Sequence, residues 1–363
     1  MKRDFKWLLA VMAAPLLFWA MPLGAREPAR ASGDDSVRQA QLAIYRLQEW
    51  YDPRTGLWKT TGWWNAANAL TTIIDFSRAT HSTQYREVIA GTYAANARGK
   101  FLNEAYDDEG WWALAWIDAY DLTGDRTYLR TASTIFDDMT SGWDDTCGGG
   151  IWWMKDRKYK NAIANELLLS VAAHLANRVE DRSQRARYDG WAIREWNWFQ
   201  RTGMIESDNL ISDGLNGRCE DNHQTKWSYN QGVIVGGLTE LSRGHGEGGV
   251  LREARRIADA AVEKLADKNG ILHDPCEPEC GPDGTQFKGI FVRNLAALTA
   301  RSPSARYKEF ITANAESLLQ HDQGSDHSFG TVWSGPPRAA TAASQSSAID
   351  ALVAVLRLRK SQP

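Results

Sequence analysis

Two kinds of helical segment alternate along almost the whole chain. One kind is amphipathic and charged, as in residues 251–268, which is typical of a helix with one face in water. The other kind is nearly uncharged, as in residues 164–176 and 231–241, and a helix that is apolar almost all round is expected to be buried. The pair recurs about six times at intervals of roughly fifty residues, which predicts two concentric rings of helices. The predicted fold is therefore all-α, an (α/α)6 barrel of six helical hairpins.

Apolar periodicity places about twelve helices in the chain, and no segment shows the alternation of a half-buried strand. The expected helices cover residues 36–50, 64–80, 83–98, 110–122, 126–140, 160–177, 183–202, 227–243, 248–267, 285–300, 304–320 and 344–359. Long stretches without helical periodicity cover residues 141–159, 203–226 and 321–343. Loops of this length are usually functional, with surface decoration as the plain alternative. None of them resembles a linker, so residues 26–363 are expected to form a single domain.

The first 25 residues have the pattern of a signal peptide. Three basic residues precede the apolar run 7–19, and the small residues Gly24 and Ala25 follow it. The apolar stretch is short and is broken by Pro15 and Pro22, so no stable membrane anchor is expected. We therefore expect residues 1–25 to be a signal peptide and the protein to be secreted or periplasmic. With a formal net charge of −3, the chain has no electrostatic reason to bind nucleic acid.

Four cysteines in an exported chain suggest two disulfides, for which three pairings are possible. We favour Cys276 with Cys280, which closes a short loop of turn-forming residues, and Cys147 with Cys219, which joins two long loops. A metal site is the competing interpretation, but no histidine stands at ligand spacing around these cysteines.

Polar and aromatic clusters lie at or just before the start of the nearly uncharged helices. They cover residues 63–68, 106–112, 160–166, 227–232 and 287–289. If these helices run parallel, all five clusters converge at one mouth of the barrel, which predicts a ligand site there. The chain also has 17 tryptophans, more than core packing usually needs, and flat indole faces suit stacking on sugar rings.

Adjacent aspartates occur four times, but only Asp107-Asp108 opens a nearly uncharged helix and is bracketed by Tyr106 and the pair Trp111-Trp112. The other pairs are explained by solvation, capping or turn formation; they are Asp34-Asp35, Asp137-Asp138 and Asp144-Asp145. Helix capping is also the plain alternative for Asp107 and Asp108.

Neighbouring carboxyl groups at a helix start can lie about 5 Å apart, near the separation that retaining glycosidases use. One carboxylate would attack the anomeric carbon, and the other would stay protonated to donate to the leaving oxygen. A like-charged neighbour and surrounding tryptophans would raise the pKa of the acid as required. We interpret Glu109 as a helix-start acid, and Glu166 as a buried carboxylate paired with Lys160 or Asn161.

The run 147–153 supplies glycine backbone and two indole rings that can approach a ligand, and it lacks the lysine of a phosphate loop. Tyr229, Asn230 and Gln231 offer groups suited to sugar hydroxyls, with helix capping as the alternative. The seven histidines are scattered singly, so neither a catalytic zinc nor a Ser-His-Asp triad has support, and no cofactor or metal is expected.

Six runs, in this order along the chain, resemble glycoside hydrolase family 76, the endo-α-1,6-mannanases. They are residues 64–68, 106–112, 147–153, 160–166, 228–232 and 287–291, followed by Trp333 and Gln345-Ser346. The resemblance implies an (α/α)6 barrel and hydrolysis of α-1,6-mannan with retention of configuration. By the family's motif, Asp107 matches the nucleophile and Asp108 the acid/base.

The expected substrate-binding residues come from these motifs and from the clusters at the helix starts. They are Trp64, Asn65, Asn68, Tyr106, Trp111, Trp112, Gly150, Trp152, Lys160, Asn161, Tyr229, Asn230, Gln231, Lys288 and Trp333. The expected partner is α-mannan or a mannooligosaccharide bound by a monomer.

Three alternatives stay open. A mannan transglycosylase would use the same residues, an epimerase-like isomerase on the same barrel would use histidine pairs, and a non-catalytic glycan-binding protein would keep only the cleft. The signal peptide and the scattered histidines argue against the isomerase.

Overall fold

The computed structural model describes residue 1, residues 33–246 and residues 248–360. The expected signal peptide, residues 1–25, lies outside the described residues apart from Met1. The long helices are α1 Gly33–Gln48, α2 Trp63–Thr80, α3 Arg86–Asn96, α4 Tyr106–Thr123, α5 Arg126–Thr140, α6 Ala162–Ala176, α7 Arg182–Phe199, α8 Ser228–His245, α9 Gly249–Lys264, α11 Phe287–Arg301, α12 Ala305–Ser317 and α13 Ala342–Lys360.

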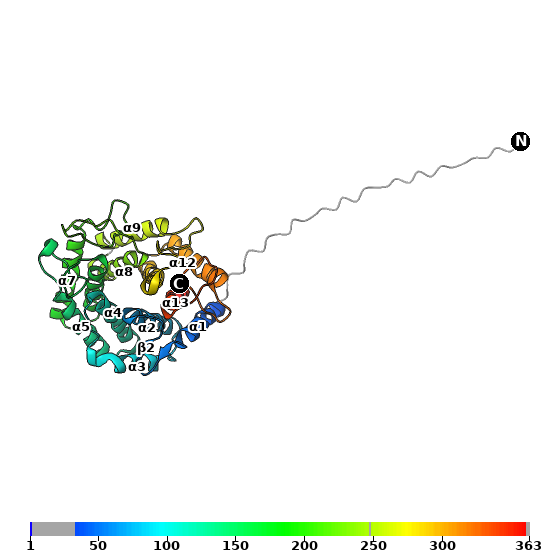
Figure 1. Cartoon of the computed structure of the whole chain (residues 1–363), viewed down its shortest axis with the longest axis horizontal. Coiled ribbons are helices and arrows are strands. Elements are labelled where there is room, and N and C mark those ends of the chain that lie inside the picture. The colour runs from blue at the N-terminus through cyan, green and yellow to red at the C-terminus, as the bar shows by residue number, and fades with distance from the viewer. Residues whose placement is uncertain (2–32, 247, 361–363) are drawn as a thin grey trace.

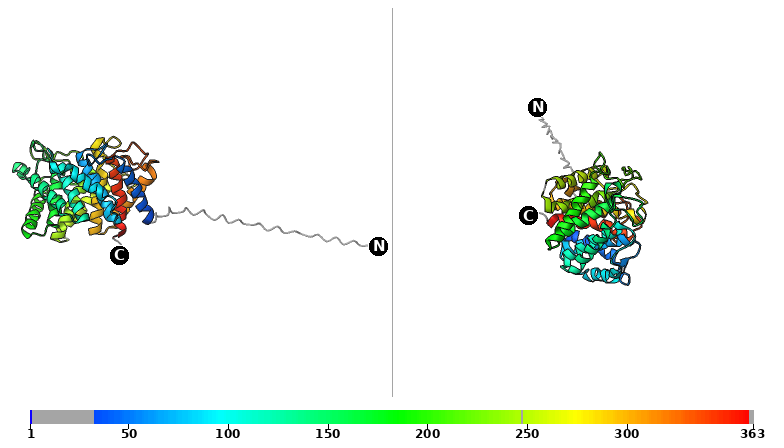
Figure 2. Two further views of the ribbon diagram at one scale, coloured as in Figure 1. Left: turned by 90° about the horizontal axis from the view of Figure 1, so that it is seen from below. Right: turned by 90° about the vertical axis from the view of Figure 1, so that its left-hand side faces the viewer.

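Six of these helices form a closed inner ring. In order around the ring, α2 packs on α4, then α6, α8, α11 and α13, and α13 packs back on α2. The charged helices lie outside it, with α5 against α4, α7 against α6, α9 against α8, and α1 against α13 (Figure 1). Figure 2 shows the helices side by side along the barrel axis. The predicted (α/α)6 barrel is confirmed.

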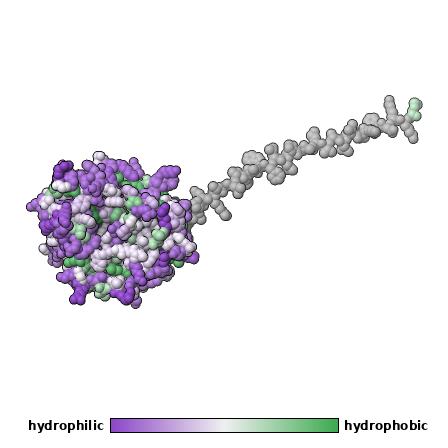
Figure 3. Space-filling model, viewed as in Figure 1, coloured by the Kyte–Doolittle hydropathy of each residue, from purple (hydrophilic) through white to green (hydrophobic). Residues whose placement is uncertain are grey.

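The burial of each ring follows its sequence pattern. All but one residue of α6 are buried, whereas α9 buries only the stripe that faces α8. Where two inner helices touch, glycine permits the contact, because a Cβ on Gly289 would lie 2.5 Å from the backbone of Ser347 in α13. Figure 3 shows mostly hydrophilic residues over the visible face. No helix among the described residues is long and apolar enough to cross a membrane.

The sequence missed several short elements. These are the strands β1 Tyr51–Asp52 and β2 Leu57–Trp58, the short helix α10 Gly281–Gly284, the 3-10 turns η1 Ala97–Gly99 and η2 Thr146–Gly148, and the π-turn η3 Leu318–Asp322. The expectation of no strand was therefore wrong for one small hairpin, which turns at Gly56 with φ +68° and is held by the Tyr51 and Trp58 rings, 5.0 Å apart. Such two-residue strands are too short for an alternating pattern to show.

Both predicted disulfides are present. Cys147 bonds to Cys219 and Cys276 bonds to Cys280, and the described residues contain no free cysteine. The first disulfide joins the loops 141–159 and 203–226, so both loops lie at the same end of the barrel, before the first turns of α6 and α8.

Candidate active site

The paired aspartates lie in the first turn of α4, which begins four residues earlier than the sequence predicted. The extended chain before the helix pairs with the loop 141–159, because Tyr106 N–H donates to the carbonyl of Trp153 at 2.9 Å. Asn103 closes the turn by accepting from Ala105 N–H at 2.9 Å. Asp107 and Asp108 therefore lie at the positive end of the helix dipole, which favours negative charge.

Asp107 is held by one tryptophan and is otherwise unsatisfied. The indole N–H of Trp153 donates to its Oδ2 at 2.9 Å, whereas its buried Oδ1 has no hydrogen-bond partner among the described residues. Burial raises the pKa of Asp107 to about 7, and the neighbouring charge of Asp108 adds to the rise. One oxygen of this carboxyl group is thus fixed, and the other is available to a ligand.

Asp108 accepts from the side-chain amide of Asn103 at 2.6 Å. Burial raises the pKa of Asp108 to about 6, against the effect of this hydrogen bond, and the carboxylate of Asp283 contributes to the rise. Because both pKa values of the pair are raised, the two carboxyl groups share roughly one proton near neutral pH.

Glu109 takes no part in this pair. It is fully buried, and its Oε1 accepts from Lys155 at 2.9 Å and from the backbone N–H of Asn103 at 3.1 Å. Burial raises its pKa to about 8, although Lys155 opposes the rise. Glu109 anchors the loop that carries Trp153.

An aromatic wall from four inner helices lies beside the aspartates. The Trp64 and Trp111 ring centroids are 5.5 Å apart, those of Trp111 and Tyr229 are 6.4 Å apart, and those of Tyr229 and Phe287 are 3.8 Å apart, all three pairs stacked. The Trp64 indole N–H donates to Asp283 at 2.9 Å. Trp153 is 39% exposed and supplies a further open ring. Two carboxyl groups beside stacked aromatic rings form an arrangement suited to sugar chemistry.

A family model described as "Glycosyl hydrolase family 76" matches residues 31–363. The chain belongs to glycosyl hydrolase family 76.

Known members of the family resemble the chain along most of its length. A Candida albicans protein named mannan endo-1,6-alpha-mannosidase DFG5 is 27% identical over 292 residues, which cover 72% of this chain and 64% of that protein. An inactive variant of an alpha-1,6-mannanase of Salegentibacter sp. HEL1_6, in which two adjacent aspartates are replaced by asparagine, was solved with alpha-1,6-mannotriose. It superposes with a TM-score of 0.79 at 25% identity and covers 89% of this chain and 99% of its own. Dfg5 from Chaetomium thermophilum shares the fold, with a TM-score of 0.80 at 18% identity and 92% of each chain covered.

Two tryptophans that the sequence assigned to substrate lie elsewhere in this family 76 barrel. Trp112 is fully buried against Trp116 and Phe101, because it points from α4 into the core rather than into the mouth. Trp333 is also fully buried, with the ammonium group of Lys288 4.7 Å from its ring centroid. Neither ring is open to a sugar in this conformation, so the structure gives these two assignments no support and they stay predictions.

Most polar side chains that the sequence assigned to substrate instead form hydrogen bonds or ion pairs within the protein. Lys288 pairs with Glu277 and donates to the carbonyl of Thr331 at 2.8 Å, and Lys160 donates to the carbonyls of Thr146, Gly149 and Gly150. Each ammonium group is buried and holds a loop, so neither is free to bind substrate.

The amides of the motifs have similar structural roles. Asn161 caps α6, Asn65 bonds to Gln286, Asn68 accepts from Arg293, and Gln231 exchanges two hydrogen bonds with the backbone of Ile211. Tyr106 is 3% exposed, Gly150 is buried against Trp198, and the Trp152 indole N–H donates to Asp144 at 2.7 Å. In this structure these groups build the mouth rather than line it, and their assignment to substrate stays a prediction.

Asn230 and Glu166 are different, because they are fully buried and their polar side-chain atoms have no partners within the described chain. The predicted pairing of Glu166 with Lys160 or Asn161 was wrong. Burial raises the pKa of Glu166 well above its usual value, and the negative charge of Asp213 adds to the rise. Of the expected substrate residues, Trp64, Trp111 and Tyr229 form the wall, in which Trp111 is only 3% exposed between its neighbours. Asn103, Trp153 and Asp283 also belong to the site but were not among the expected substrate-binding residues.

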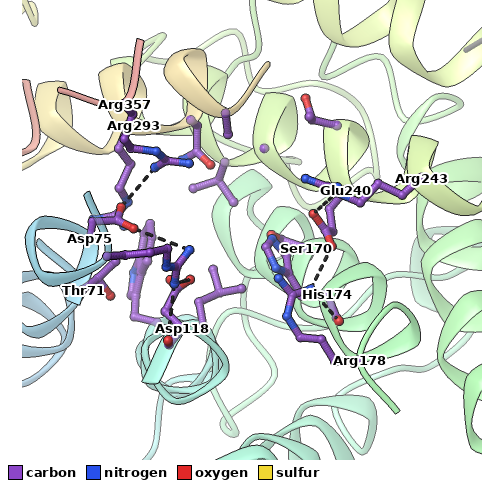
Figure 4. Close-up of a pocket in the computed structure, with 18 residues that line it drawn as sticks. Thr71, Asp75, Asp118, Ser170, His174, Arg178, Glu240, Arg243, Arg293 and Arg357 are labelled. Carbon is purple, nitrogen blue, oxygen red and sulfur yellow. Dashed lines mark hydrogen bonds and ion pairs between the residues drawn. The ribbon is translucent and has the colours of Figure 1, made fainter. Parts of the chain in front are cut away.

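A cavity of about 120 Å³ lies in the barrel interior, lined mainly by residues from the middle and C-terminal halves of the inner helices. Trp111 lines it and so separates it from the mouth. Figure 4 shows ion pairs around this cavity, including those between Arg178 and Glu240, at 2.8 Å, and between Arg357 and Asp75, at 3.2 Å. Since helix C-termini are negative ends, arginines here stabilise the convergent helices.

Replacing Arg178 by methionine is expected to lower the free energy of unfolding by about 2 kcal/mol, because buried Glu240 loses one of its two arginine partners and keeps only Arg243. Burial raises the pKa of Glu240, but His174 and Arg178 outweigh burial and hold it at about 2, so its contribution is present at neutral pH and is lost as the pH falls from about 4.5 toward 2. The matched control is Arg126→Met, whose exposed pair with Glu180 contributes less than about 0.5 kcal/mol. If urea unfolding shows equal losses of unfolding free energy for Arg178→Met and Arg126→Met, the buried pair of Arg178 and Glu240 does not stabilise the barrel more than an exposed pair does.

Proposed function

We propose that this protein is an exported hydrolase that cleaves α-1,6-mannosidic linkages within mannan chains and retains the configuration at the anomeric carbon. The observation that carries the proposal is the pair Asp107 and Asp108, both with raised pKa values, beside the wall of Trp64, Trp111 and Tyr229. Its support from relatives is the inactive mannanase variant, in which two adjacent aspartates are replaced. The matched region spans less than two thirds of the Candida relative, so the activity rests on the site and on the family.

In the proposed first step, Asp107 forms a bond to the anomeric carbon while the bond from that carbon to the glycosidic oxygen breaks. Asp108 gives its proton to the departing oxygen. In the second step, water attacks the anomeric carbon, Asp108 takes the proton of that water, and the bond to Asp107 breaks. Two inversions at one carbon give net retention.

The free pair holds its proton more readily on Asp107, whose pKa is about 7, than on Asp108, whose pKa is about 6. The division of roles requires the opposite order when substrate is bound. A glycosidic oxygen beside Asp108 supplies an acceptor for its proton, and positive charge that develops at the anomeric carbon stabilises ionised Asp107. The unpartnered Oδ1 of Asp107 is the oxygen that attacks in this proposal.

The deciding experiment is incubation of the purified protein with unbranched α-1,6-mannan, mannooligosaccharides and other α-glycans. Internal cleavage is expected to release short mannooligosaccharides from the α-1,6-linked backbone, and NMR should show the α-anomer first. Products longer than the substrate would identify a transglycosylase, and binding without new reducing ends would identify a glycan-binding protein. Early release of the β-anomer would rule out retention.

The pH dependence of kcat/KM should be a narrow bell with its maximum near pH 6.5. Below about pH 6 both carboxyl groups are protonated, and above about pH 7 both are ionised, so neither state holds one nucleophile and one acid.

Replacing Asp283 by asparagine removes a negative charge that raises the pKa of Asp108, so the acidic limb of the pH profile should move to lower pH. A value of kcat/KM that does not change between pH 5 and 8 would contradict the hypothesis that Asp107 and Asp108 share one proton.

A further inference from the structure

The loop 203–226 brings together two carboxylates and an imidazole outside the active site. They belong to Glu206, Asp221 and His223, and one ligand atom from each lies within 4.8 Å of the other two. Nδ1 of His223 lies 3.2 Å from Oε1 of Glu206 and 3.0 Å from Oδ2 of Asp221. Ligand atoms about 2.1 Å from one metal ion are about 3.0 Å apart at right angles and about 3.4 Å apart in a tetrahedron, so separations of this size are compatible with one shared ion.

The orientation of Asp221 turns one of its carboxylate oxygens toward His223. Its side chain is only 7% exposed, and Oδ1 accepts from the hydroxyl of Ser212 and from the backbone N–H of His223. Oδ2 is buried, faces His223, and forms no hydrogen bond with any described residue. A buried carboxylate oxygen without a donor is costly unless a cation or a proton occupies the site.

Glu206 is oriented in a similar way. Its Oε2 accepts from the ammonium group of Lys226 at 2.8 Å, which leaves Oε1 directed toward the imidazole. Lys226 also bonds to Asp208 at 2.9 Å, so its charge is shared with a carboxylate outside the cluster. Hydrogen bonds of this kind, behind the ligands, hold metal-binding side chains in place.

We propose that Glu206, Asp221 and His223 form a binding site for a divalent transition-metal ion, for which Zn²⁺ is the probe. Two carboxylate oxygens and one imidazole nitrogen suit zinc or manganese, whereas calcium takes six or more oxygen ligands. The fourth and further positions would hold water, because His223 lies at the exposed edge of the cluster. This site is distinct from the paired aspartates and does not depend on the proposed hydrolysis.

A bound ion would also restrict the motion of the neighbouring loop 141–159, which carries Trp153. Asn222, between two of the ligands, donates to the hydroxyl of Tyr159 at 2.8 Å. The Tyr159 ring contacts the edge of Trp153, at a centroid distance of 6.3 Å, and Trp153 donates to Asp107. The cluster therefore supports, through two contacts, the residue that positions the carboxyl group of Asp107.

The test is calorimetric titration of Zn²⁺ into the full-length mature protein, without a histidine tag and after treatment with a chelator. One equivalent should bind, and hydrogen exchange over residues 203–226 and 152–160 should slow on binding. His223→Gln and Asp221→Asn should each weaken binding at least about tenfold. His245→Gln is the matched control, since His245 pairs with Asp189 at 2.6 Å and belongs to no three-residue cluster among the described residues, so this variant should bind Zn²⁺ like the parent chain.

Circular dichroism without metal establishes that each variant is folded, and His223→Gln, at an exposed position, keeps the test valid if Asp221→Asn does not fold. The proposal is overturned if no saturable Zn²⁺ binding occurs, if both ligand variants bind as the parent does, or if Ca²⁺ binds more tightly than Zn²⁺. Unaltered affinity would mean that a protonated His223 occupies the space between the carboxylates. None of these readouts uses mannan hydrolysis, so failure of this site and failure of the proposed function are distinguishable.

Discussion

Replacing Asp107 by asparagine is expected to reduce kcat/KM for α-1,6-mannan by about three orders of magnitude or more. The amide is a poor nucleophile and cannot form the glycosyl ester, so only slow uncatalysed attack within the bound complex remains. The Trp153 indole N–H can still donate to the amide oxygen, so the geometry of the mouth should be preserved. Initial rates of reducing-end release measure the loss.

The same variant should be folded and more stable than the parent chain above pH 7. Because burial raises the pKa of Asp107 above that of the unfolded chain, ionisation destabilises the folded state as the pH rises through about 7. Asparagine removes that cost, and thermal unfolding at pH 8 should show a higher Tm for the variant. A catalytic carboxyl group that costs stability fits a functional position better than a cap. A folded Asp107→Asn variant with full activity would overturn the assignment.

Azide separates the roles of the two aspartates. With Asp108→Asn, the ester on Asp107 can still form from a substrate with a good leaving group, and azide then gives a sugar azide of retained configuration. In the variant Asp107→Gly, the missing side chain leaves room for azide, which attacks the anomeric carbon directly and gives the sugar azide of inverted configuration. If the two products are exchanged, Asp108 is the nucleophile, as the order of pKa values in the free pair would favour.

The barrel could be predicted because helix periodicity is a local property of the sequence, and the share of apolar residues in a helix indicates whether that helix is buried. The start of α4 could not, because its N-terminal turn depends on a backbone bond from Tyr106 to the carbonyl of Trp153, 47 residues along the chain. That displacement moved Asp107 and Asp108 from a preceding loop into the first turn. Trp153 escaped notice as a partner of Asp107 for the same reason, since only the fold brings the two together.

The motifs marked the mouth of the barrel but not which of their side chains face it. Lys160 and Gln231 look like sugar-binding groups in sequence, yet both hold loop backbone in the interior. Burying a polar group requires a partner, so a structural amide is as constrained as a functional one, and sequence cannot separate the two. Nothing in the sequence indicated Asp283, because only the fold brings its exposed carboxylate to Trp64 and near Asp108.

Removing the disulfide between Cys147 and Cys219, by replacing both with serine, should lower the free energy of unfolding by about 4 kcal/mol. The bond spans 72 residues, so it restricts the unfolded chain far more than the bond between Cys276 and Cys280, which spans 4. The matched control is the double serine variant of that second pair, for which the same chain-entropy relation gives about 2 kcal/mol. Urea unfolding of both variants measures the difference.

The longer disulfide also joins two loops that build the mouth, so its removal tests whether they need the bond in the folded state. Lys160 holds the carbonyls of Gly149 and Gly150, and the Trp198 indole N–H donates to the carbonyl of Cys147 at 3.0 Å. Because these bonds persist without the disulfide, the loop should stay in place and kcat should fall less than tenfold, even though stability falls sharply. A large loss of kcat with a small loss of stability would reverse that conclusion and make the disulfide a device for positioning Trp153 rather than for restricting the unfolded chain.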